Sequence, residues 1–368
     1  MSQLSQVSIV LPSLDPDEKL LCVIDGLLAA GFDDIILVND GSQSQNMHYF
    51  ETAAQHAQVH LLHHSVNRGK GAALKTAFDW FLKNRPERLG VITVDGDNQH
   101  RADDIVRCAE HMLATGKLIL GVRDFSLPEV PARSRSGNRI TSFVFKVFVG
   151  MRVSDTQTGL RAIPAKWLTL LLSVSGDRFE YETNMLLAMK EHAITFDEVK
   201  IRTVYIEENK SSHFRVIRDS CRIYKLLLGH FFRYTLSSAI SAVLDEGLFA
   251  LLSFLLRGVL IGFALTAVPA AMARVVSSIC NFFINKKIVF RKNVSTPRAL
   301  LRYYLLAVPT ALLQIGLTHG VFILFGIGAG QTLLRAVIYG FVMAVLFILT
   351  FLVQQRWVFS DNVKSRCK

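Results

Sequence analysis

The sequence predicts an α/β domain with a mostly parallel sheet, followed by an all-α domain of four membrane spans. Two observations predict this division. The first 225 or so residues alternate short apolar runs with segments of helical periodicity, whereas the chain from residue 231 onward consists of long apolar runs separated by short basic clusters. The length of 368 residues and the positive mean hydropathy also indicate more than one domain and a membrane-associated chain.

The first domain is expected to begin with repeated strand–helix units. The apolar runs predict strands at 7–12, 35–38, 59–62 and from 91, and the helical spacing predicts helices at 17–30, 46–56 and 71–82. Strands that alternate with helices favour a parallel sheet covered by helices.

Polar residues follow each of the predicted strands. In parallel sheets ligands bind beyond the carboxyl ends of the strands, so these residues are expected to share one crevice: Pro12 and Asp15, Asp40, Lys70, and Asp95 with Asp97. Taken singly, such residues could be ordinary turns or helix caps. The dinucleotide-binding glycine pattern and the P-loop pattern are both missing from this region.

The segment 91–100 predicts a metal site. A short buried strand delivers Asp95 and Asp97 into a loop, where the carbonyl oxygen of Gln99 can join their carboxylates around one hard cation. Oxygen ligands of this kind suit Mg²⁺ or Mn²⁺. The alternative is a polar turn without a metal.

Cysteine usage and charge exclude several classes. The five cysteines have neither a zinc-binding spacing nor a disulfide framework, and the N-terminus lacks the pattern of a cleaved signal peptide. A cytoplasmic first domain is therefore expected. The net charge of +11 lies largely beside apolar spans, which disfavours nucleic acid as the partner.

Four spans are predicted at 231–256, 259–283, 303–327 and 336–353. The loop between the second and third spans carries six lysines and arginines, against Arg257 and Arg335 in the opposite loops. The positive-inside rule then places both chain ends in the cytoplasm. Residues 213–230, and also 140–149, have the composition of amphipathic helices that lie on a membrane surface.

The membrane half contains an internal repeat. Arg233 aligns with Arg302 and Phe282 with Phe351, both at an offset of 69 positions (302 − 233 and 351 − 282), which predicts two related helical hairpins. Charges inside the spans are costly and usually paired, so an ion pair between Asp245 and Arg274 is expected. The segment from Gln354 resembles the signature of processive polysaccharide synthases but lacks one residue.

The strand-end segments resemble, in their order, family 2 glycosyltransferases of the GT-A fold, in the branch of dolichyl-phosphate mannose synthase and bacterial polyprenyl-phosphate glycosyltransferases. The matching segments are 38–42, 67–71, 95–100, 121–123, 135–139 and 155–161. Residues 231–359 resemble a GtrA-like membrane domain. The expected organisation is a GT-A domain at 1–212, a juxtamembrane helix at 213–230 and a transmembrane domain at 231–360.

The resemblance implies roles for individual residues. Asp97 and Gln99, beside Asp95, would hold the metal, and the nucleotide sugar would be bound by Pro12, Asp15, Asp40, Lys70, Asp95, Lys210 and His213. The last two stand where relatives usually carry an arginine and a Gly-x-Ser-Lys loop, so the choice of nucleotide and sugar is open.

Arginines downstream of the metal loop predict a phosphate-bearing acceptor, because guanidinium groups bind phosphate oxygens in a bidentate manner. The candidates are Arg123, Arg135, Arg139 and Arg161. Asp155 would orient the acceptor, and Glu182 is either a general base or a carboxylate that stabilises a helix start.

These inferences predict an inverting, metal-dependent transfer of a sugar from a nucleoside diphosphate to a polyprenyl phosphate, at the cytoplasmic face of a bacterial inner membrane. A translocator of lipid-linked sugar and a processive polysaccharide synthase are the alternatives. Whether the chain self-associates is open.

Overall fold

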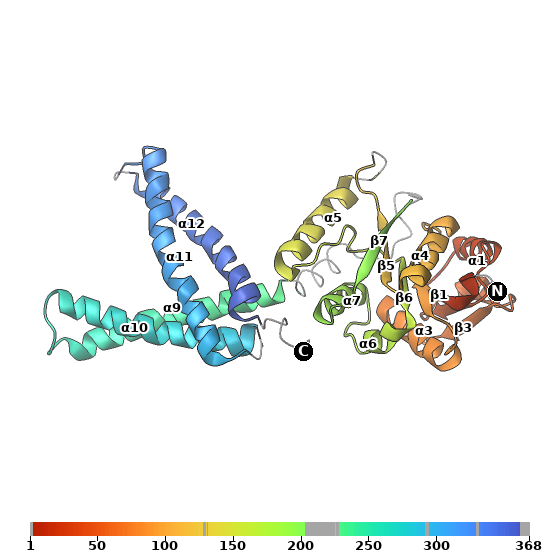
Figure 1. Ribbon diagram of the computed structural model, residues 1–368, viewed down its shortest axis with the longest axis horizontal. Helices are drawn as coiled ribbons and strands as arrows, with labels where there is room; N and C mark the ends of the chain where they lie inside the picture. Colours follow the sequence, from red (N-terminus) through yellow and green to blue (C-terminus); the bar gives the residue numbers. More distant parts are fainter. Residues whose placement is uncertain are drawn as a thin grey trace. The chain divides into compact units, whose positions relative to one another are not determined.

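The computed structural model describes residues 3–127, 130, 132–202, 225, 228–290, 294–328 and 331–360. The chain divides into two compact units, Met1–Leu227 and Leu228–Lys368 (Figure 1). The juxtamembrane helix expected at 213–230 lies almost entirely outside the described residues.

The first unit is built on a seven-stranded sheet with the order β3-β2-β1-β4-β6-β5-β7. All neighbouring strands are parallel except β6, which runs antiparallel to both β4 and β5. The strands are β1 (Val7–Ser13), β2 (Ile35–Asn39), β3 (Val59–His63), β4 (Gly90–Thr93), β5 (Leu118–Arg123), β6 (Arg161–Pro164) and β7 (Phe196–Ile201).

Helices cover both faces of this sheet (Figure 1). The interior strands β2 and β4 are buried at every position, which explains why their sequences are continuous apolar runs rather than alternating ones. The helices are α1 (Lys19–Ala29), α2 (Met47–Ala53), α3 (Lys70–Asn84), α4 (Ala102–Thr115), α5 (Ala132–Val144), α6 (Leu168–Leu172) and α7 (Glu180–Glu191).

The main core lies between the sheet and helices α1 and α4. Ile9, Ile35 and Ile92, from three adjacent strands, belong to one buried apolar cluster with Leu27 of α1 and Met112 of α4. On the other face α3 contacts β1 and β2, and it also packs against α6 and α7. This packing brings the start of α3 close to the carboxyl ends of the central strands.

The predicted elements of this unit are present, with different ends. The helix expected at 46–56 begins as a 3₁₀ turn at Ser44–Asn46 and ends at Ala53, because the chain then turns through hydrogen bonds from Gln55 and His56 back to Thr52 and Ala53. The helix expected at 71–82 is longer and reaches Asn84.

The second unit contains four helices that are long and apolar enough to cross a membrane: Phe231–Leu256, Phe263–Val289, Thr296–Leu324 and Thr332–Val358. They correspond to α9 (Gly229–Leu256), α10 (Phe263–Ile284), α11 (Thr296–Leu324) and α12 (Thr332–Val353), with π-helical turns at Asn285–Val289 and Gln354–Val358.

The third span begins seven residues earlier than the apolar run predicts, at Thr296 rather than 303. Ser295 precedes it and a proline occupies its first turn, a combination typical of a helix start. A search for apolar residues alone misses such a start because it carries basic residues.

The two hairpins α9–α10 and α11–α12 meet through contacts that repeat with the 69-residue offset. Tyr234 of the first hairpin packs on Phe351 of the second, with ring centroids 5.2 Å apart, and Tyr303 of the second packs on Phe282 of the first at 5.5 Å. Exchanging the repeats converts one pair into the other. The hairpins are thus related by an approximate two-fold axis.

Equivalent residues of the two repeats meet near this axis. The Asn285 amide donates to Gln354 Oε1 over 3.2 Å, and the rings of Phe290 and Phe359 stack at 5.0 Å. Gln354, only 4% exposed, is the first residue of the segment that resembles a processive-synthase signature. Its side chain serves this joint between the repeats instead.

The predicted ion pair inside the first hairpin is confirmed. Arg274 Nη2 lies 2.9 Å from Asp245 Oδ2, and the Ser277 hydroxyl donates to the other carboxylate oxygen over 2.7 Å. Asp245 is therefore neutralised and hydrogen-bonded within the apolar span, as a charge in that environment requires.

Candidate active site

The loop after β4 presents the two acidic residues expected to bind a metal. The backbone of Val94 still donates to Val10 of β1, and the chain leaves the sheet at Asp95. Asn98 then takes a left-handed conformation with φ +59°, which folds the loop so that the Gln99 amide donates to Asp97 Oδ1 over 3.2 Å. Asp95 and Asp97 are both partly exposed.

Lys70 joins this loop to α7. Its Nζ lies 2.7 Å from Asp95 Oδ1 and 2.9 Å from Glu182 Oε1, so one ammonium group neutralises two carboxylates from distant parts of the chain. Burial by itself would lower the pKa of Lys70, but the two carboxylates outweigh burial and raise that pKa. Lys70 is thus a fixed positive charge in this cluster.

The carboxylates of the metal loop differ in their electrostatic surroundings. Burial would raise the pKa of Asp95, but Lys70 and then His100, whose Nε2 lies 3.7 Å from Asp95 Oδ2, hold it well below its usual range. Burial and the adjacent Asp95 carboxylate raise the pKa of Asp97. Lys70 and His100 therefore compensate the charge of Asp97 less than they compensate that of Asp95.

Two glycines allow α3 to begin where it does. Gly69 has φ +103°, and a Cβ there would lie 2.4 Å from the Asp177 carbonyl oxygen. A Cβ at Gly71 would lie 2.5 Å from Cβ of Tyr181. The close approach that these glycines permit places Lys70 within reach of Glu182 in the first turn of α7.

The structure gives Asp40 a different immediate role from the nucleoside contact predicted for it. Asp40 is 3% exposed, and its carboxylate accepts hydrogen bonds from the backbone amides of Arg68 and Gly69 at 2.9 and 2.7 Å and from His64 Nδ1 at 2.7 Å. These contacts hold the loop that precedes α3. Sequence reasoning missed His64, although its place directly after the third strand is shared with the other predicted residues.

Pro12 and Asp15 lie at the end of β1, as predicted. Pro12 is paired with Val38 in the parallel ladder. Asp15, in a left-handed conformation with φ +46°, accepts from the Gln43 amide over 2.7 Å and from Asn46 over 3.2 Å. The loops after β1 and β2 are therefore tied together beside the crevice.

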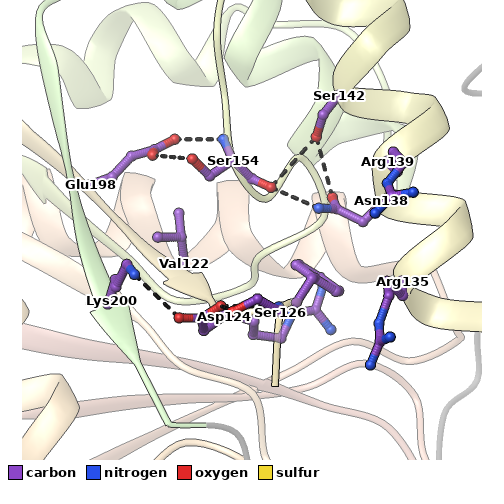
Figure 2. Close-up of a pocket in the computed structure, with 12 residues that line it drawn as sticks. Val122, Asp124, Ser126, Arg135, Asn138, Arg139, Ser142, Ser154, Glu198 and Lys200 are labelled. Carbon is purple, nitrogen blue, oxygen red and sulfur yellow. Dashed lines mark hydrogen bonds and ion pairs between the residues drawn. The ribbon is translucent and has the colours of Figure 1, made fainter. Parts of the chain in front are cut away.

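A cavity of about 540 Å³ lies at the carboxyl end of β5, between residues of α5 and β7 (Figure 2). Four cationic side chains line it: Arg123, Arg135, Arg139 and Lys200. Figure 2 shows Arg135 and Arg139 on α5, at one side of the cavity, and Lys200 at the opposite side. Three of the arginines predicted to bind an acceptor phosphate thus share one cavity.

Both acidic residues that line this cavity are occupied by other groups. Glu198 accepts from the backbone amide of Ser154 over 2.7 Å and from its hydroxyl. Asp124 accepts from Ser126 and pairs with Lys200 at 3.2 Å, and these contacts, Ser126 first, lower the pKa of Asp124 to about 2. Arg135 donates from Nη2 to the Leu127 carbonyl over 2.9 Å, and its buried Nε has no partner among the described residues.

Asp155 is paired with Arg123. The Asp155 carboxylate is fully buried, and it accepts from Arg123 Nε over 2.6 Å and from Arg123 Nη2 over 3.0 Å. The Gln157 amide is a further donor at 3.1 Å. This geometry lets Asp155 orient Arg123 toward the cavity.

Arg161 does not reach the cavity. It is 1% exposed, and it donates from Nε to the Thr158 carbonyl over 3.1 Å and from Nη1 to the Glu182 carbonyl over 2.9 Å. Burial lowers the pKa of its guanidinium. Arg161 is the first residue of β6, a strand that the sequence pattern did not reveal, and its two hydrogen bonds make it a tether between the 158 loop and α7.

Glu182 lies in the first turn of α7 and is 8% exposed, with Oε1 bound to Lys70. Both sequence interpretations, a helix-start carboxylate and a residue of the reaction site, agree with this place. Lys210 and His213, the remaining predicted donor-site residues, lie outside the described residues.

The donor set of the metal loop fits Mg²⁺ or Mn²⁺ in one particular mode of binding. Among the described residues, no three histidine, cysteine, aspartate or glutamate side chains gather in a cluster that could hold a metal by themselves. Mg²⁺ commonly binds through one or two carboxylates and completes its shell with water and substrate phosphates. The partly exposed Asp97 beside Asp95, with a raised pKa, fits that mode of binding.

A mostly parallel sheet with a charged crevice at its strand ends, joined to four helices that are apolar enough to cross a membrane, defines a membrane-associated protein of GT-A-like fold. Residues 8–168 match the Glycosyl transferase family 2 model, and residues 233–359 match the GtrA/DPMS transmembrane domain. The chain is therefore a glycosyltransferase with a family 2 catalytic domain and a GtrA/DPMS transmembrane domain.

Two curated relatives carry informative names. A UDP-N-acetylglucosamine–dolichyl-phosphate N-acetylglucosaminyltransferase of Methanococcus voltae is 26% identical, over 60% of this chain and 95% of its own. An undecaprenyl-phosphate mannosyltransferase of Micrococcus luteus is 25% identical, over 44% of this chain and 68% of its own. Among solved structures, glucosyl-3-phosphoglycerate synthase of Mycobacterium tuberculosis matches 61% of this chain and 78% of its own, with 16% identity and a TM-score of 0.44.

Proposed function

We propose that this protein transfers a sugar from a nucleoside-diphosphate sugar to a polyprenyl phosphate, with inversion at the anomeric carbon, and that it does so at the cytoplasmic face of a bacterial inner membrane. Two curated relatives are named as transferases that act on dolichyl phosphate or undecaprenyl phosphate. The transmembrane domain would anchor the protein in a membrane, where a polyprenyl phosphate is also found.

The observation that carries this proposal is the pairing of the two candidate bases. Asp155 is held by Arg123, and Glu182 is held by Lys70. An acceptor hydroxyl has to lose its proton during attack and needs a base for it. A phosphate monoester is already ionised near neutral pH and needs none. The paired carboxylates therefore favour a phosphate acceptor.

The cationic cavity supports the same acceptor chemistry. Arg135 and Arg139 project from α5. Arg123 is the last residue of β5, and Asp155 orients its side chain. Guanidinium groups bind phosphate oxygens through paired N–H donors. In our proposal the acceptor phosphate lies against these three arginines with one oxygen directed at the anomeric carbon.

Lys70 and the metal loop would act on the other side of the reaction. A bound Mg²⁺ or Mn²⁺, held by Asp97 with Asp95 and the Gln99 carbonyl oxygen, supplies positive charge to the leaving diphosphate. Lys70 keeps Asp95 ionised and in place, because its ammonium group lies 2.7 Å from that carboxylate. Direct displacement by the phosphate oxygen inverts the anomeric configuration.

The orientation of the membrane unit follows from its basic residues. Lys286 and Lys287 lie in the π-helical turn at the end of the second span, and Arg298 and Arg302 in the first turns of the third. By the positive-inside rule this end faces the cytoplasm. Labelling of single cysteines placed at residues 258 and 297 in sealed cells tests it: only the former should react with an impermeant reagent.

The acceptor class is tested with the purified full-length protein in detergent. Sugar nucleotides are offered together with either undecaprenyl phosphate or the matching undecaprenol, which lacks the phosphate. Transfer to the phosphate alone is expected, with the inverted anomer as product, and Asp97→Ala should abolish it in a folded protein. Transfer to undecaprenol, or full activity of Asp97→Ala, would refute the acceptor or the metal assignment respectively.

A further inference from the structure

We infer that His64 is a positioning residue of the transfer reaction, which acts through Asp40 on the start of α3 and thereby on Lys70. The inference rests on the proposed role of Lys70 in the donor site. His64 follows β3 directly and is 8% exposed, and its two ring nitrogens contact two different parts of the chain.

The first contact of His64 is with Asp40. His64 Nδ1 lies 2.7 Å from Asp40 Oδ1. An ionised carboxylate only accepts hydrogen bonds, so the ring nitrogen is the donor. The same carboxylate accepts from the backbone amides of Arg68 and Gly69, the two residues directly before α3. Asp40 thus joins His64 to the loop that leads into the helix.

The second contact is with the helix itself. His64 Nε2 lies 2.9 Å from Thr76 Oγ1, in the second turn of α3. In the neutral ring this nitrogen is the acceptor and the threonine hydroxyl donates. The imidazole therefore holds α3 at two points, at its start through Asp40 and in its second turn through Thr76.

Lys70 is the first residue of the helix that is held in this way. Its ammonium group serves two carboxylates at 2.7 and 2.9 Å, a geometry that tolerates little displacement. A shift of about 1 Å in a positioning element can cost a factor of ~10² in rate. A rotation or a shift of α3 would separate Lys70 from Asp95 or Glu182 and leave their charges uncompensated.

The sharpest test is a double-mutant cycle between His64 and Lys70. If His64 acts through Lys70, the effects of the two substitutions should not be additive. We expect His64→Ala to lower kcat about 10- to 100-fold with little change in the KM for the acceptor. In the His64→Ala/Lys70→Met variant the loss should be no greater than in Lys70→Met alone. Losses that multiply in the double variant would overturn the inference.

Conservative variants separate positioning from stability. His64→Asn retains an N–H donor for Asp40 and should recover part of kcat, whereas Thr76→Val removes only the second contact and should lose less. His56→Ala, on a more exposed histidine of the same domain, is the matched control and should remain within twofold of the wild type. Should His64→Ala not fold, unchanged transfer by both His64→Asn and Thr76→Val would overturn the inference.

Binding of the donor nucleotide in Mg²⁺, measured by calorimetry without acceptor, separates this inference from the choice of acceptor. If the acceptor is not a polyprenyl phosphate, the wild type binds the nucleotide but gives no lipid product. The coupling of His64 to Lys70 is then measured on nucleotide affinity, where additive losses again count against it.

Discussion

Lys70 and Asp95 form an ion pair across the crevice at the strand ends, with Nζ 2.7 Å from Oδ1, and the same ammonium group reaches Glu182 at 2.9 Å. One lysine thus connects the loop after β4 with the first turn of α7. The positive charge of Lys70 therefore holds the carboxylates of Asp95 and Glu182 close to each other.

Replacement of Lys70 should therefore be severe. Lys70→Met removes the ammonium group that Asp95 and Glu182 share, and we expect kcat to fall by about 10² to 10³, the usual effect of removing one preorganised electrostatic group. Steady-state transfer kinetics measure this. Lys75→Met, also on α3 and paired with the exposed Asp177, is the control; an equal loss there would contradict a specific role of Lys70.

Metal removal should abolish transfer reversibly. EDTA is expected to stop the reaction, and Mg²⁺ or Mn²⁺ should restore it, because the leaving diphosphate needs a compensating charge. Binding of Mn²⁺ in the presence of the nucleotide, followed by electron paramagnetic resonance, should weaken at least tenfold in Asp97→Asn. Asp103→Asn, whose side chain is 85% exposed on α4, should bind as the wild type does. Activity in excess EDTA would rule out metal dependence.

The cationic cavity makes a prediction about the acceptor alone. Arg135→Gln should raise the KM for the lipid phosphate about tenfold, because one charged hydrogen-bonding group contributes ~1.5 kcal/mol or more, and should leave the KM for the sugar nucleotide unchanged. Initial rates at varied acceptor give the value. Arg152→Gln, an exposed arginine outside the cavity, is the matched control. A change confined to the KM for the sugar nucleotide would show that the cavity binds the donor and not the acceptor.

Cys108 provides a test of the folded catalytic domain. Its thiol is buried in α4, and burial, with Asp104 adding to it, raises the pKa of the thiol to about 12. Since the thiol is protonated below its pKa and only the thiolate is the nucleophile, Cys108 should stay unmodified by iodoacetamide at pH 8. The exposed Cys22 should react. Peptide mapping distinguishes them, and rapid labelling of Cys108 in the native protein would contradict this packing.

The joint between the membrane hairpins can be tested by a second double-mutant cycle. Asn285→Leu leaves the buried Oε1 of Gln354 without the donor that Asn285 supplies, and should destabilise the unit by ~1 kcal/mol. Asn285→Leu/Gln354→Leu replaces both partners and should recover part of that loss. Thermal unfolding in detergent measures both, with the exposed Gln331→Leu as control. Strictly additive losses of stability would show that Asn285 and Gln354 do not interact.

Much of the fold could be predicted from the sequence because its signals are local. The uninterrupted apolar residues at 35–38 indicated a strand, and the structure shows every residue of β2 buried. The spans were located by composition, but their ends shifted wherever a helix begins with polar or basic residues, as at Thr296. An antiparallel strand such as β6 could not be predicted, because its direction depends on neighbours far away in the chain.

The candidate site was predicted unevenly for the same reason. Arg123 and Arg135 were expected beside a phosphate, and they line one cavity with Arg139. Arg161 has the same residue type and lies in a similar motif, yet its side chain is buried against the carbonyl oxygens of Thr158 and Glu182. Residue type alone does not distinguish an arginine that lines a cavity from one that tethers two loops.

The sequence by itself determined the order of the first four strands and the three helices between them, the placement of polar residues after those strands, the four apolar spans and their internal repeat. These depend on periodicity and composition over short stretches. Only the tertiary structure decided which charges meet: Lys70 with Glu182 and Asp95, Arg123 with Asp155, and Asp40 with His64. Ion pairs and hydrogen bonds act over a few ångströms, and such distances between remote residues are set by the packing of the whole domain.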